Sequence, residues 1–478
     1  MRAPWILATL LALPLVAHIG VNDVFFEGLA GPYPIYVTIR PPVVIPGIAE
    51  ISIRSSAPDL RKIRVTPMTL TGAGSRYPPT PDLLVRSKDD PNLFTGGLWI
   101  MFSGSWQILI MVDGDRGPGA LSVPVPASSQ QVSTMDNLTG AILIGLLLLL
   151  SLGVVGILAA AVREARLPPG QAPDPLRQKA GRWAMVLGLA AVGGTLWIGR
   201  GWWLDESANY ARSLYRPLHM NATLSHDHLN LQVLPRTPTD LKVPDDFIPD
   251  HNHLMHLYAI REPDSDAVFH IHPSRLSPGH FVSKLPAMPA GRYRLFADLV
   301  RANGFPETLT TSIDVPLATS GPSDSPDDAG SILPAALGSR LQVIFDRPNA
   351  IHPGQPVSLT FRVLDADGNP APNLRPYLGM PAHLAIFRRD FTVFSHIHPH
   401  GNISMAAFLL AQRNIFPLNG NMIISDHAKE VVDGAGPSEF SFPFGFPLSG
   451  AYRAVLQFGT PQRIETASFD IIVVPSAN

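Results

Sequence analysis

Two long apolar runs constrain the fold of this chain more than any other feature. Residues 138–162 are 25 consecutive positions without a charge, and residues 183–204 form a second run in which Arg200 is the only charged residue. About 20 apolar residues let a helix cross the hydrocarbon core of a bilayer, and a helix of a soluble domain is rarely apolar on every side. The two runs therefore predict a hairpin of two transmembrane helices.

The loop between the runs, residues 163–182, predicts the orientation of this hairpin. It carries five basic side chains and two acidic ones. Because basic residues concentrate in cytoplasmic loops, we expect this loop inside the cell. The flanking regions, residues 18–137 and 205–478, are then expected outside the cytoplasm.

The N-terminus has the pattern of a secretory signal peptide. Arg2 precedes an uncharged stretch that ends at Ala17, so residues 1–17 are predicted to be removed; an uncleaved membrane anchor is the alternative. The chain has no Cys, which excludes disulfides, thiol catalysis and Cys-ligated metals. We expect a protein of the bacterial inner (cytoplasmic) membrane whose N- and C-terminal domains face the periplasm.

Both outer regions have the pattern of short β-strands. Segments such as residues 36–40, 49–54 and 357–363 are rich in β-branched and aromatic residues, and 49 Pro and 39 Gly punctuate the chain. The net charge of −2 gives no basic excess for a nucleic-acid partner. We therefore predict a mainly β fold of three β-sandwich modules plus the transmembrane hairpin.

Internal repetition supports three modules. Gly104–Trp106, Gly291–Tyr293 and Gly450–Tyr452 each place a glycine two residues before an aromatic residue at the start of an apolar strand, and a last strand follows. This pattern is typical of a closing hairpin. A stretch rich in Ser, Pro and Asp has linker composition. The predicted bounds are residues 18–137 for the first module, 205–318 for the second, 319–335 for the linker and 336–478 for the third.

The distribution of histidine is the strongest chemical signal. Of the 16 His residues only His18 precedes residue 201. A pattern of three histidines occurs twice, as a strand that begins with His and, after a turn, the segment His-Ile-His-Pro. The copies are His256, His270 and His272 in the second module, and His383, His396 and His398 in the third.

Strand geometry would let each copy bind one ion. Residues i and i+2 of a strand point to the same face, so both histidines of His-Ile-His reach the same side. If the intervening segments are hairpin turns, we expect His256 opposite His270 and His383 opposite His396, with Cβ atoms about 5 Å apart. Three imidazoles in a triangle suit copper or, alternatively, zinc with one position open.

Other interpretations of these residues stay open. The histidines could form hydrogen bonds within each sandwich, because the same strand faces carry apolar residues such as Tyr258 and Phe394. The pair His251 and His253 either extends the first site or lies in a solvated loop. Further candidates are His226 with His228, a mature N-terminal His18, and the thioethers of Met255, Met380 and Met405, which would favour copper(I); His280, His352, His400 and His427 are expected to be solvated.

Catalytic motifs give little support for an enzyme. The sequence lacks Gly-x-Ser-x-Gly, a phosphate-binding loop and His-Glu-x-x-His. The acidic pairs Asp245-Asp246 and Asp327-Asp328 lie beside Pro or in the linker, as turn residues do. We therefore expect no turnover. A copper oxidoreductase subunit is a weaker alternative, because it needs an open metal site beside a substrate pocket.

The two C-terminal modules resemble a known family. Residues 376–399 and 256–293, each with its His-Ile-His-Pro, look like the YtkA-like and FixH-like extracytoplasmic β-sandwich modules of bacteria. Some of those are linked to copper handling or to metal supply for terminal oxidases. The resemblance implies an immunoglobulin-like or cupredoxin-like sandwich and makes copper the first metal to test.

The order of one outer β-module, two spans and further β-modules is also similar to the copper-bearing periplasmic-domain subunit of particulate methane monooxygenase. In that subunit the His-x-His belongs to the first module, which here has only His18. The similarity is therefore architectural, and no residues are carried over.

The sequence thus favours a membrane-anchored periplasmic protein that binds copper for buffering or for delivery to an envelope metalloprotein or transporter. Its other partner would be the lipid bilayer. The alternative is an envelope scaffold that recruits a protein partner, with structural histidines and no metal.

Overall fold

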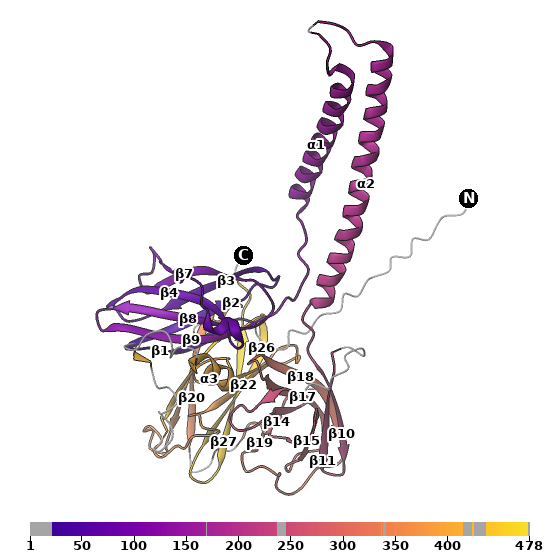
Figure 1. Ribbon diagram of the computed structural model, residues 1–478. Coiled ribbons are helices and arrows are strands. Elements are labelled where there is room, and N and C mark those ends of the chain that lie inside the picture. Colours follow the sequence, from indigo (N-terminus) through magenta and orange to yellow (C-terminus); the bar gives the residue numbers. More distant parts are fainter. Residues whose placement is uncertain are drawn as a thin grey trace, which may run out of the picture. The chain divides into compact units, whose positions relative to one another are not determined.

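The computed structural model describes residues 22–476, apart from 169, 237–244, 336, 338–340, 349, 414–422 and 425–435. The predicted signal peptide, His18 and His427 lie outside the described residues. The chain divides into two units, one of residues 129–215 and the other of the remaining residues. Figure 1 shows two long helices and a larger part built of strands, which confirms the prediction of a mainly β fold.

The unit of residues 129–215 contains α1 (Asn137–Glu164) and α2 (Pro175–Ser213), both long and apolar enough to cross a membrane. The side chains of Asp136 and Asp174 cap them by accepting hydrogen bonds from backbone N–H groups in their first turns. Gly181 lets the helices approach, because a Cβ there would lie 3.2 Å from the Ala159 carbonyl oxygen.

The first module, residues 22–128, is a sandwich of two sheets around one core. Phe26, Val37 and Ile51 of one sheet pack with Val65 and Ile110 of the other. The first sheet consists of β1 (Val24–Ala30), β2 (Tyr33–Arg40), β3 (Gly47–Arg54), β7 (Leu93–Ile100) and β6 (Val85–Arg86). The second consists of β5 (Asp82–Leu83), β4 (Leu60–Thr69), β8 (Gly104–Gly114), β9 (Gly117–Ala127) and the parallel strand β24 (Ile423–Ile424).

The second module, residues 216–335, also pairs two sheets. Leu229 and Leu231 of the smaller sheet pack against Leu257 and Leu295 of the larger one. The smaller sheet is β10 (His219–Ser225), β11 (His228–Leu234), β16 (His280–Lys284) and β15 (Ser274–Ser277). The larger is β12 (Phe247–Ile248), β17 (Gly291–Arg301), β13 (His256–Arg261), β14 (Ala267–Ile271) and β19 (Ala329–Ile332), with β18 (Pro306–Val315) paired to β17.

The third module, residues 341–476, repeats this plan. Phe361 and Phe442 of one sheet pack against Leu384 and Leu456 of the other. The sheets are β20 (Gln342–Asp346), β21 (Pro356–Leu364) and β25 (Glu439–Gly445), and β23 (Phe394–Ile397), β22 (His383–Arg388), β26 (Gly450–Gly459) and β27 (Ile464–Val473).

The predicted closing hairpins are confirmed in all three modules as β8–β9, β17–β18 and β26–β27. Their glycines adopt φ values of 130° to 151°, in the region that favours glycine. Trp106, Tyr293 and Tyr452 are buried, and each donates a hydrogen bond to the carbonyl oxygen four residues earlier. The repeated aromatic residue therefore closes the turn that enters the hairpin.

The predicted linker, residues 319–335, is in part a strand. Its residues 329–332 form β19, which pairs antiparallel with β14 at the edge of the larger sheet of the second module. Gly330 permits this approach, because a Cβ there would lie 2.1 Å from the Phe269 ring. The composition of this segment does not indicate the short edge strand, because the strand forms by pairing with β14.

The second and third modules pack through a shared apolar core. Tyr258, Phe296 and Val268 come from the second module, and Phe387 and Phe394 from the third. The rings of Phe296 and Phe394 are stacked with centroids 4.4 Å apart. These strand faces, which also carry the predicted ligands, therefore turn toward each other.

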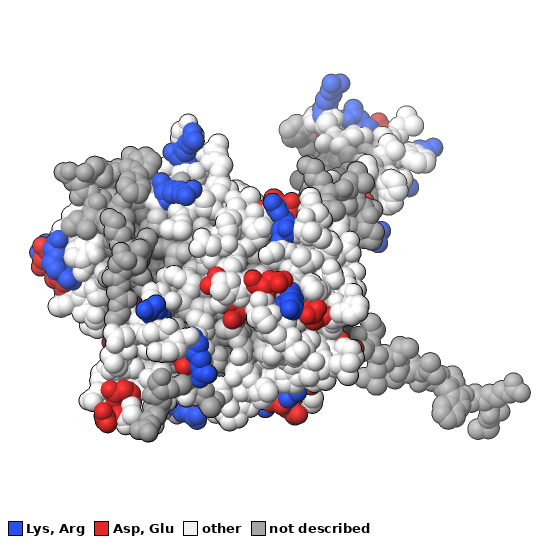
Figure 2. Space-filling model, turned by 90° about the horizontal axis from the view of Figure 1, so that it is seen from below, with Lys and Arg blue, Asp and Glu red and all other residues white. Residues whose placement is uncertain are grey.

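The third module also contacts the first. Helix α3 (Met405–Arg413) places Phe408 in the core of the first module, and the Phe25 backbone N–H donates to Asn402 Oδ1 at 2.9 Å. On the face in Figure 2, basic and acidic side chains occur in small scattered groups, some mixed and some of one sign, without an extended patch of either charge.

Candidate metal centre

Eight histidines meet between the second and third modules. Ring contacts with centroid separations of 4.1 to 6.3 Å connect all of them. We call this group the histidine cluster; it comprises His251, His253, His256, His270 and His272 of the second module and His383, His396 and His398 of the third.

The strand register within the cluster differs from the one we predicted. His270 pairs with Tyr258 rather than His256, and His396 pairs with Ala385 rather than His383. Each hairpin turn lies one residue further along the chain than the predicted register requires; in the first, β13 ends at Arg261 and β14 begins at Ala267. His256 and His383 are therefore diagonal neighbours of His270 and His396, still on the same face.

The structure brings the first predicted group together. His256, His270 and His272 are fully buried and offer ligand atoms that lie within 4.8 Å of one another. We call them the first triad.

In each ring of the first triad, the nitrogen that faces away from the other two histidines lies beside a hydrogen-bond acceptor. We call it the outer nitrogen, and the one that faces the other histidines the inner nitrogen. The Nε2–H of His256 donates to the Asp250 carbonyl oxygen at 3.0 Å, and the Nδ1–H of His272 donates to Asp328 Oδ1 at 2.9 Å. His270 Nδ1 lies 3.2 Å from the hydroxyl of Tyr377, whose own proton goes to the Asp327 carbonyl oxygen. That hydroxyl can therefore only accept from His270.

The inner nitrogens of the first triad consequently carry no hydrogen and each present a lone pair. His256 Nδ1 and His270 Nε2 face each other at 3.1 Å, and His272 Nε2 is buried without a hydrogen-bond partner. Two lone pairs at this distance repel unless a cation binds both, and nitrogens 3.1 Å apart can both bind one ion at about 2.1 Å. The donor set fits a metal whose ligands are oriented by outer hydrogen bonds.

A second group of three spans the two modules. His251 of the second module joins His383 and His398 of the third, again with ligand atoms within 4.8 Å. We call these residues the second triad. His251 Nε2 and His398 Nε2 are 3.2 Å apart. The role of His251 is open in the sequence, because nothing in a sequence shows that a loop of one module reaches the strands of another.

The outer nitrogens of the second triad follow the same rule. His383 Nε2–H donates to the Tyr377 carbonyl oxygen at 3.0 Å, and His398 Nδ1–H donates to the Ile403 carbonyl oxygen at 3.2 Å. His396, the sixth predicted ligand, is outside this triad but places Nε2 3.0 Å from His383 Nδ1. Its Nδ1 lies 3.6 Å from the Asp298 carboxylate.

The two modules position their histidines with equivalent loops. The backbones of Asp250 and His253 pair with each other before β13, as those of Tyr377 and Met380 do before β22. The residue that follows the first member of each pair adopts a positive φ, 47° at His251 and 52° at Leu378. The loop carbonyl then accepts from the histidine six residues later, which fixes that ring.

Burial lowers the pKa of every triad imidazole. The pKa falls to about 4 for His251 and to about 3 for His398, and it lies well below the usual value of 6.5 for His256, His270 and His383. Desolvation penalises the charged ring in each case, and neighbouring imidazoles add to it. Burial also raises the pKa of Asp298 to about 7. The imidazoles are thus neutral at neutral pH, the form that binds metals.

Several other sequence candidates have structural positions. Met255 lies in the core of the second module, and Met405 packs against the core of the first. His228 pairs with Asp227 at 2.8 Å, away from the cluster. Asp328 closes the predicted turn by donating its backbone N–H to the Ser325 carbonyl oxygen, and its buried carboxylate in addition orients His272 by accepting from the ring and the backbone N–H of that residue. A pair of acidic residues in a linker-like stretch gives no signal for such a role.

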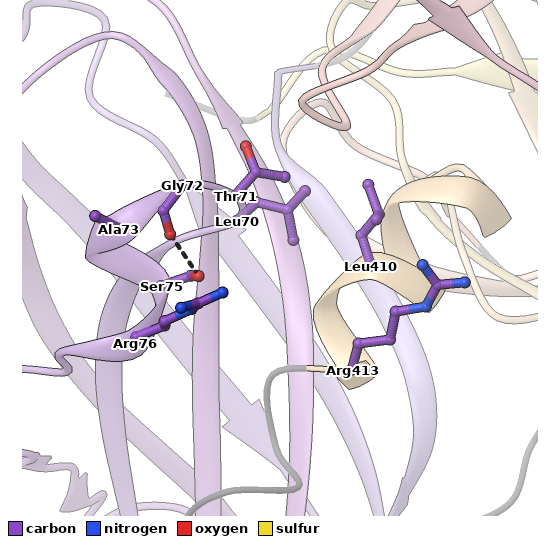
Figure 3. A pocket seen from close by; sticks show the side chains of 8 residues that line it. All are labelled: Leu70, Thr71, Gly72, Ala73, Ser75, Arg76, Leu410 and Arg413. Carbon is purple, nitrogen blue, oxygen red and sulfur yellow. Dashed lines mark hydrogen bonds between the residues drawn. The ribbon is translucent and has the colours of Figure 1, made fainter.

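Two cavities lie apart from the cluster. One of about 530 Å³ is lined by residues after β4, including Arg76, and by Leu410 and Arg413 of α3, which face each other in Figure 3. The second, smaller cavity lies between the three modules and is lined by residues such as Trp106, Pro306 and Asn402. Neither cavity is lined by a histidine of the cluster.

Comparisons with known proteins give a family match for the third module alone. The family described as "Domain of unknown function (DUF8832)" matches residues 338–474. No curated protein matches the chain.

Solved structures share only remote similarity with this chain. The tetra-tandem repeat in the extending region of a large adhesion protein is 9% identical, with 93% of this chain and 82% of that chain covered and a TM-score of 0.16. The ICAM-5 D1-D4 ectodomain fragment is 8% identical, with 92% and 77% covered and a TM-score of 0.16. Escherichia coli alpha-2-macroglobulin activated by porcine elastase is 10% identical, with 95% and 31% covered and a TM-score of 0.18. Similarity at this level carries no argument about function.

Proposed function

We propose that this protein is a membrane-anchored, periplasm-facing copper-binding protein that holds one ion in each histidine triad for buffering or for delivery to a membrane partner. The observation that carries the proposal is the orientation of the rings. Outer N–H groups bind acceptors, while inner lone pairs converge and His272 Nε2 has no other partner. Neutral imidazoles would hold the metal, and the protein would catalyse no reaction in this role.

Copper is favoured by the donor set. The two triads consist of imidazoles, and the described residues around them offer no thiolate, because the chain has no Cys. Imidazole suits copper and zinc, and copper(II) binds such sites more tightly than zinc does. The resemblance of residues 256–293 and 376–399 to YtkA-like and FixH-like modules supports the same choice.

Membrane anchoring and orientation are supported by α1 and α2. Both helices are long and apolar enough to span a bilayer, and few of their residues are buried. The connecting loop carries the basic side chains of residues 163–182. By the positive-inside rule, the modules that hold the triads would then face the periplasm.

The direct test is metal binding by the full-length protein in detergent. We expect about two equivalents of copper per chain, measured by elemental analysis and by titration of Cu(I) and Cu(II) against a competing chelator. A variant with His270, His272, His396 and His398 changed to Ala should lose both. The matched control changes His219, His226, His228 and His280 to Ala and should keep both.

The outcomes separate metal binding from a purely structural role. If the wild-type protein binds no metal and both variants fold equally well, the copper proposal is wrong and an envelope scaffold is favoured. In cells, deletion should change copper sensitivity or oxidase maturation. An unchanged phenotype at all copper levels would count against buffering and delivery.

A further inference from the structure

A histidine and a carboxylate lie at the surface beside the buried first triad. His253 Nε2 is 2.9 Å from Asp327 Oδ2. The two side chains are 20% and 47% exposed, whereas His256, His270 and His272 are exposed by 4% or less. This pair therefore brings a partly exposed imidazole and carboxylate to the solvent beside the buried first triad.

The pair also adjoins atoms that have no partner. The ring of His253 lies 4.1 Å from that of His272, and at 5.9 Å from that of His256. Among the described residues, both His272 Nε2 and Asp328 Oδ2 are buried without a hydrogen-bond partner. Asp328 follows Asp327 in sequence, so the exposed carboxylate and the buried one belong to adjacent residues.

Contacts on both sides hold the pair in place. The backbones of His253 and Asp250 exchange two hydrogen bonds of 2.9 Å. The Tyr377 hydroxyl, from the third module, donates to the Asp327 carbonyl oxygen at 2.8 Å and also contacts His270. The residues that position the surface pair, Asp250 and Tyr377, thus also contact the rings of the first triad.

We propose that His253 and Asp327 form a transfer site through which a divalent transition-metal ion enters the first triad. This inference rests on the proposed function, since it requires the triad to bind metal. An imidazole and a carboxylate suit Cu²⁺ or Zn²⁺, and the negative charge attracts the cation. Two protein ligands hold an ion less tightly than three imidazoles, so the ion passes inward by ligand exchange, without a change of oxidation state.

The experiment follows the rate of copper uptake by the full-length apo protein. Stopped-flow absorbance would record the transfer of Cu²⁺ from a chromophoric chelator to the wild type and to the variants Asp327→Asn and His253→Gln. We expect Asp327→Asn to take up the first-triad ion about tenfold more slowly, the lower end of the range by which local charge raises association rates. We expect His253→Gln to slow uptake as well, because it removes the imidazole ligand of the transfer site. Final stoichiometry and affinity should be unchanged, because neither residue belongs to the triad.

A matched pair elsewhere on the module provides the control. Asp227 and His228 form a similar exposed contact of 2.8 Å, so Asp227→Asn and His228→Gln should leave uptake unchanged. Unaltered rates in both transfer-site variants would overturn the inference while leaving copper binding intact. Loss of one equivalent at equilibrium would also overturn it, because the residues would then be ligands. A wild type that binds no Cu²⁺ would defeat the proposed function and this inference together.

Discussion

At the scale of the residue, which of its two ring nitrogens carries the hydrogen decides whether each imidazole can bind a metal. Five of the six triad histidines place one ring nitrogen against a hydrogen-bond acceptor and the other toward neighbouring histidines. Backbone carbonyls of Asp250, Tyr377 and Ile403 accept from three of these rings. Because a neutral imidazole has a single N–H, each such bond leaves a lone pair for a metal.

Single substitutions should therefore remove one ion at a time. His272→Ala should lower the copper content from about two equivalents to about one, and His383→Ala should do the same through the other triad. Elemental analysis of the purified proteins measures this directly. His219→Ala, at an exposed position of β10, should retain both equivalents. Loss of both ions from either single variant would show that the triads do not bind independently.

The buried imidazoles should also make the apo protein sensitive to acid. Seven histidines have pKa values below 6.5, so they bind protons only on unfolding. The free energy of unfolding then falls as the pH drops below 6.5, by up to about 1.4 kcal/mol per pH unit for each such ring. Carboxyls whose pKa is raised by desolvation act in the opposite direction, Asp298 with a pKa of about 7 and also Asp250, Asp23 and Glu27, but these four are outnumbered by the seven imidazoles.

Thermal unfolding of the metal-free protein between pH 7 and pH 5 measures this dependence. We expect Tm to fall by at least about 5 °C over that range. A Tm that stays constant or rises would mean that the rings are solvated in the metal-free protein.

At the scale of the element, the hairpins β13–β14 and β22–β23 place their histidines on faces that are otherwise apolar. The apolar part of each face packs on the other module, and the histidines continue the same layer. Our predicted register was wrong by two residues in both hairpins, yet the strand faces were right. The reason is that a shift of two residues along one strand keeps every side chain on its side of the sheet.

Removing an aromatic ring from this layer should weaken both folding and metal binding. Phe296→Ala would delete the ring stacked 4.4 Å from Phe394, and we expect a loss of about 3 to 5 kcal/mol in the free energy of unfolding. Chemical denaturation measures the loss, and copper titration should show weaker binding at the second triad, which spans both modules. Ile472→Ala, at a position 64% exposed on β27, should change neither quantity.

At the scale of the whole molecule, the three modules belong to one unit although α1 and α2 separate the first from the others in sequence. Helix α3 and strand β24 of the third module extend the core and a sheet of the first. A fragment that begins after α2 would therefore expose apolar surface such as Phe408. Metal binding should be measured on the full-length chain.

The proposed topology can be tested by cysteine labelling, since the chain has no Cys of its own. Gln171→Cys, in the loop between α1 and α2, should react with a membrane-impermeant thiol reagent only after the inner membrane is permeabilised. Lys88→Cys and Asp264→Cys, at exposed positions of the first and second modules, should react from the periplasm. Labelling of all three from the same side would contradict a transmembrane hairpin.

The sequence by itself determined the features that depend on local pattern. Apolar length marked α1 and α2, strand periodicity and turn residues indicated three sandwiches, and the repeated glycine and aromatic residue located the closing hairpins. The spacing of His256, His270 and His272 also grouped these residues, because i and i+2 positions share a strand face in any sheet.

Only the tertiary structure decided which groups complete the centre. His251 joins His383 and His398, Asp328 orients His272, and Tyr377 of the third module contacts His270 of the second. These contacts depend on how two sheets from different modules pack, and no local pattern records that packing. The strand at residues 329–332 was hidden for the same reason: its pairing energy comes from β14 rather than from its own composition.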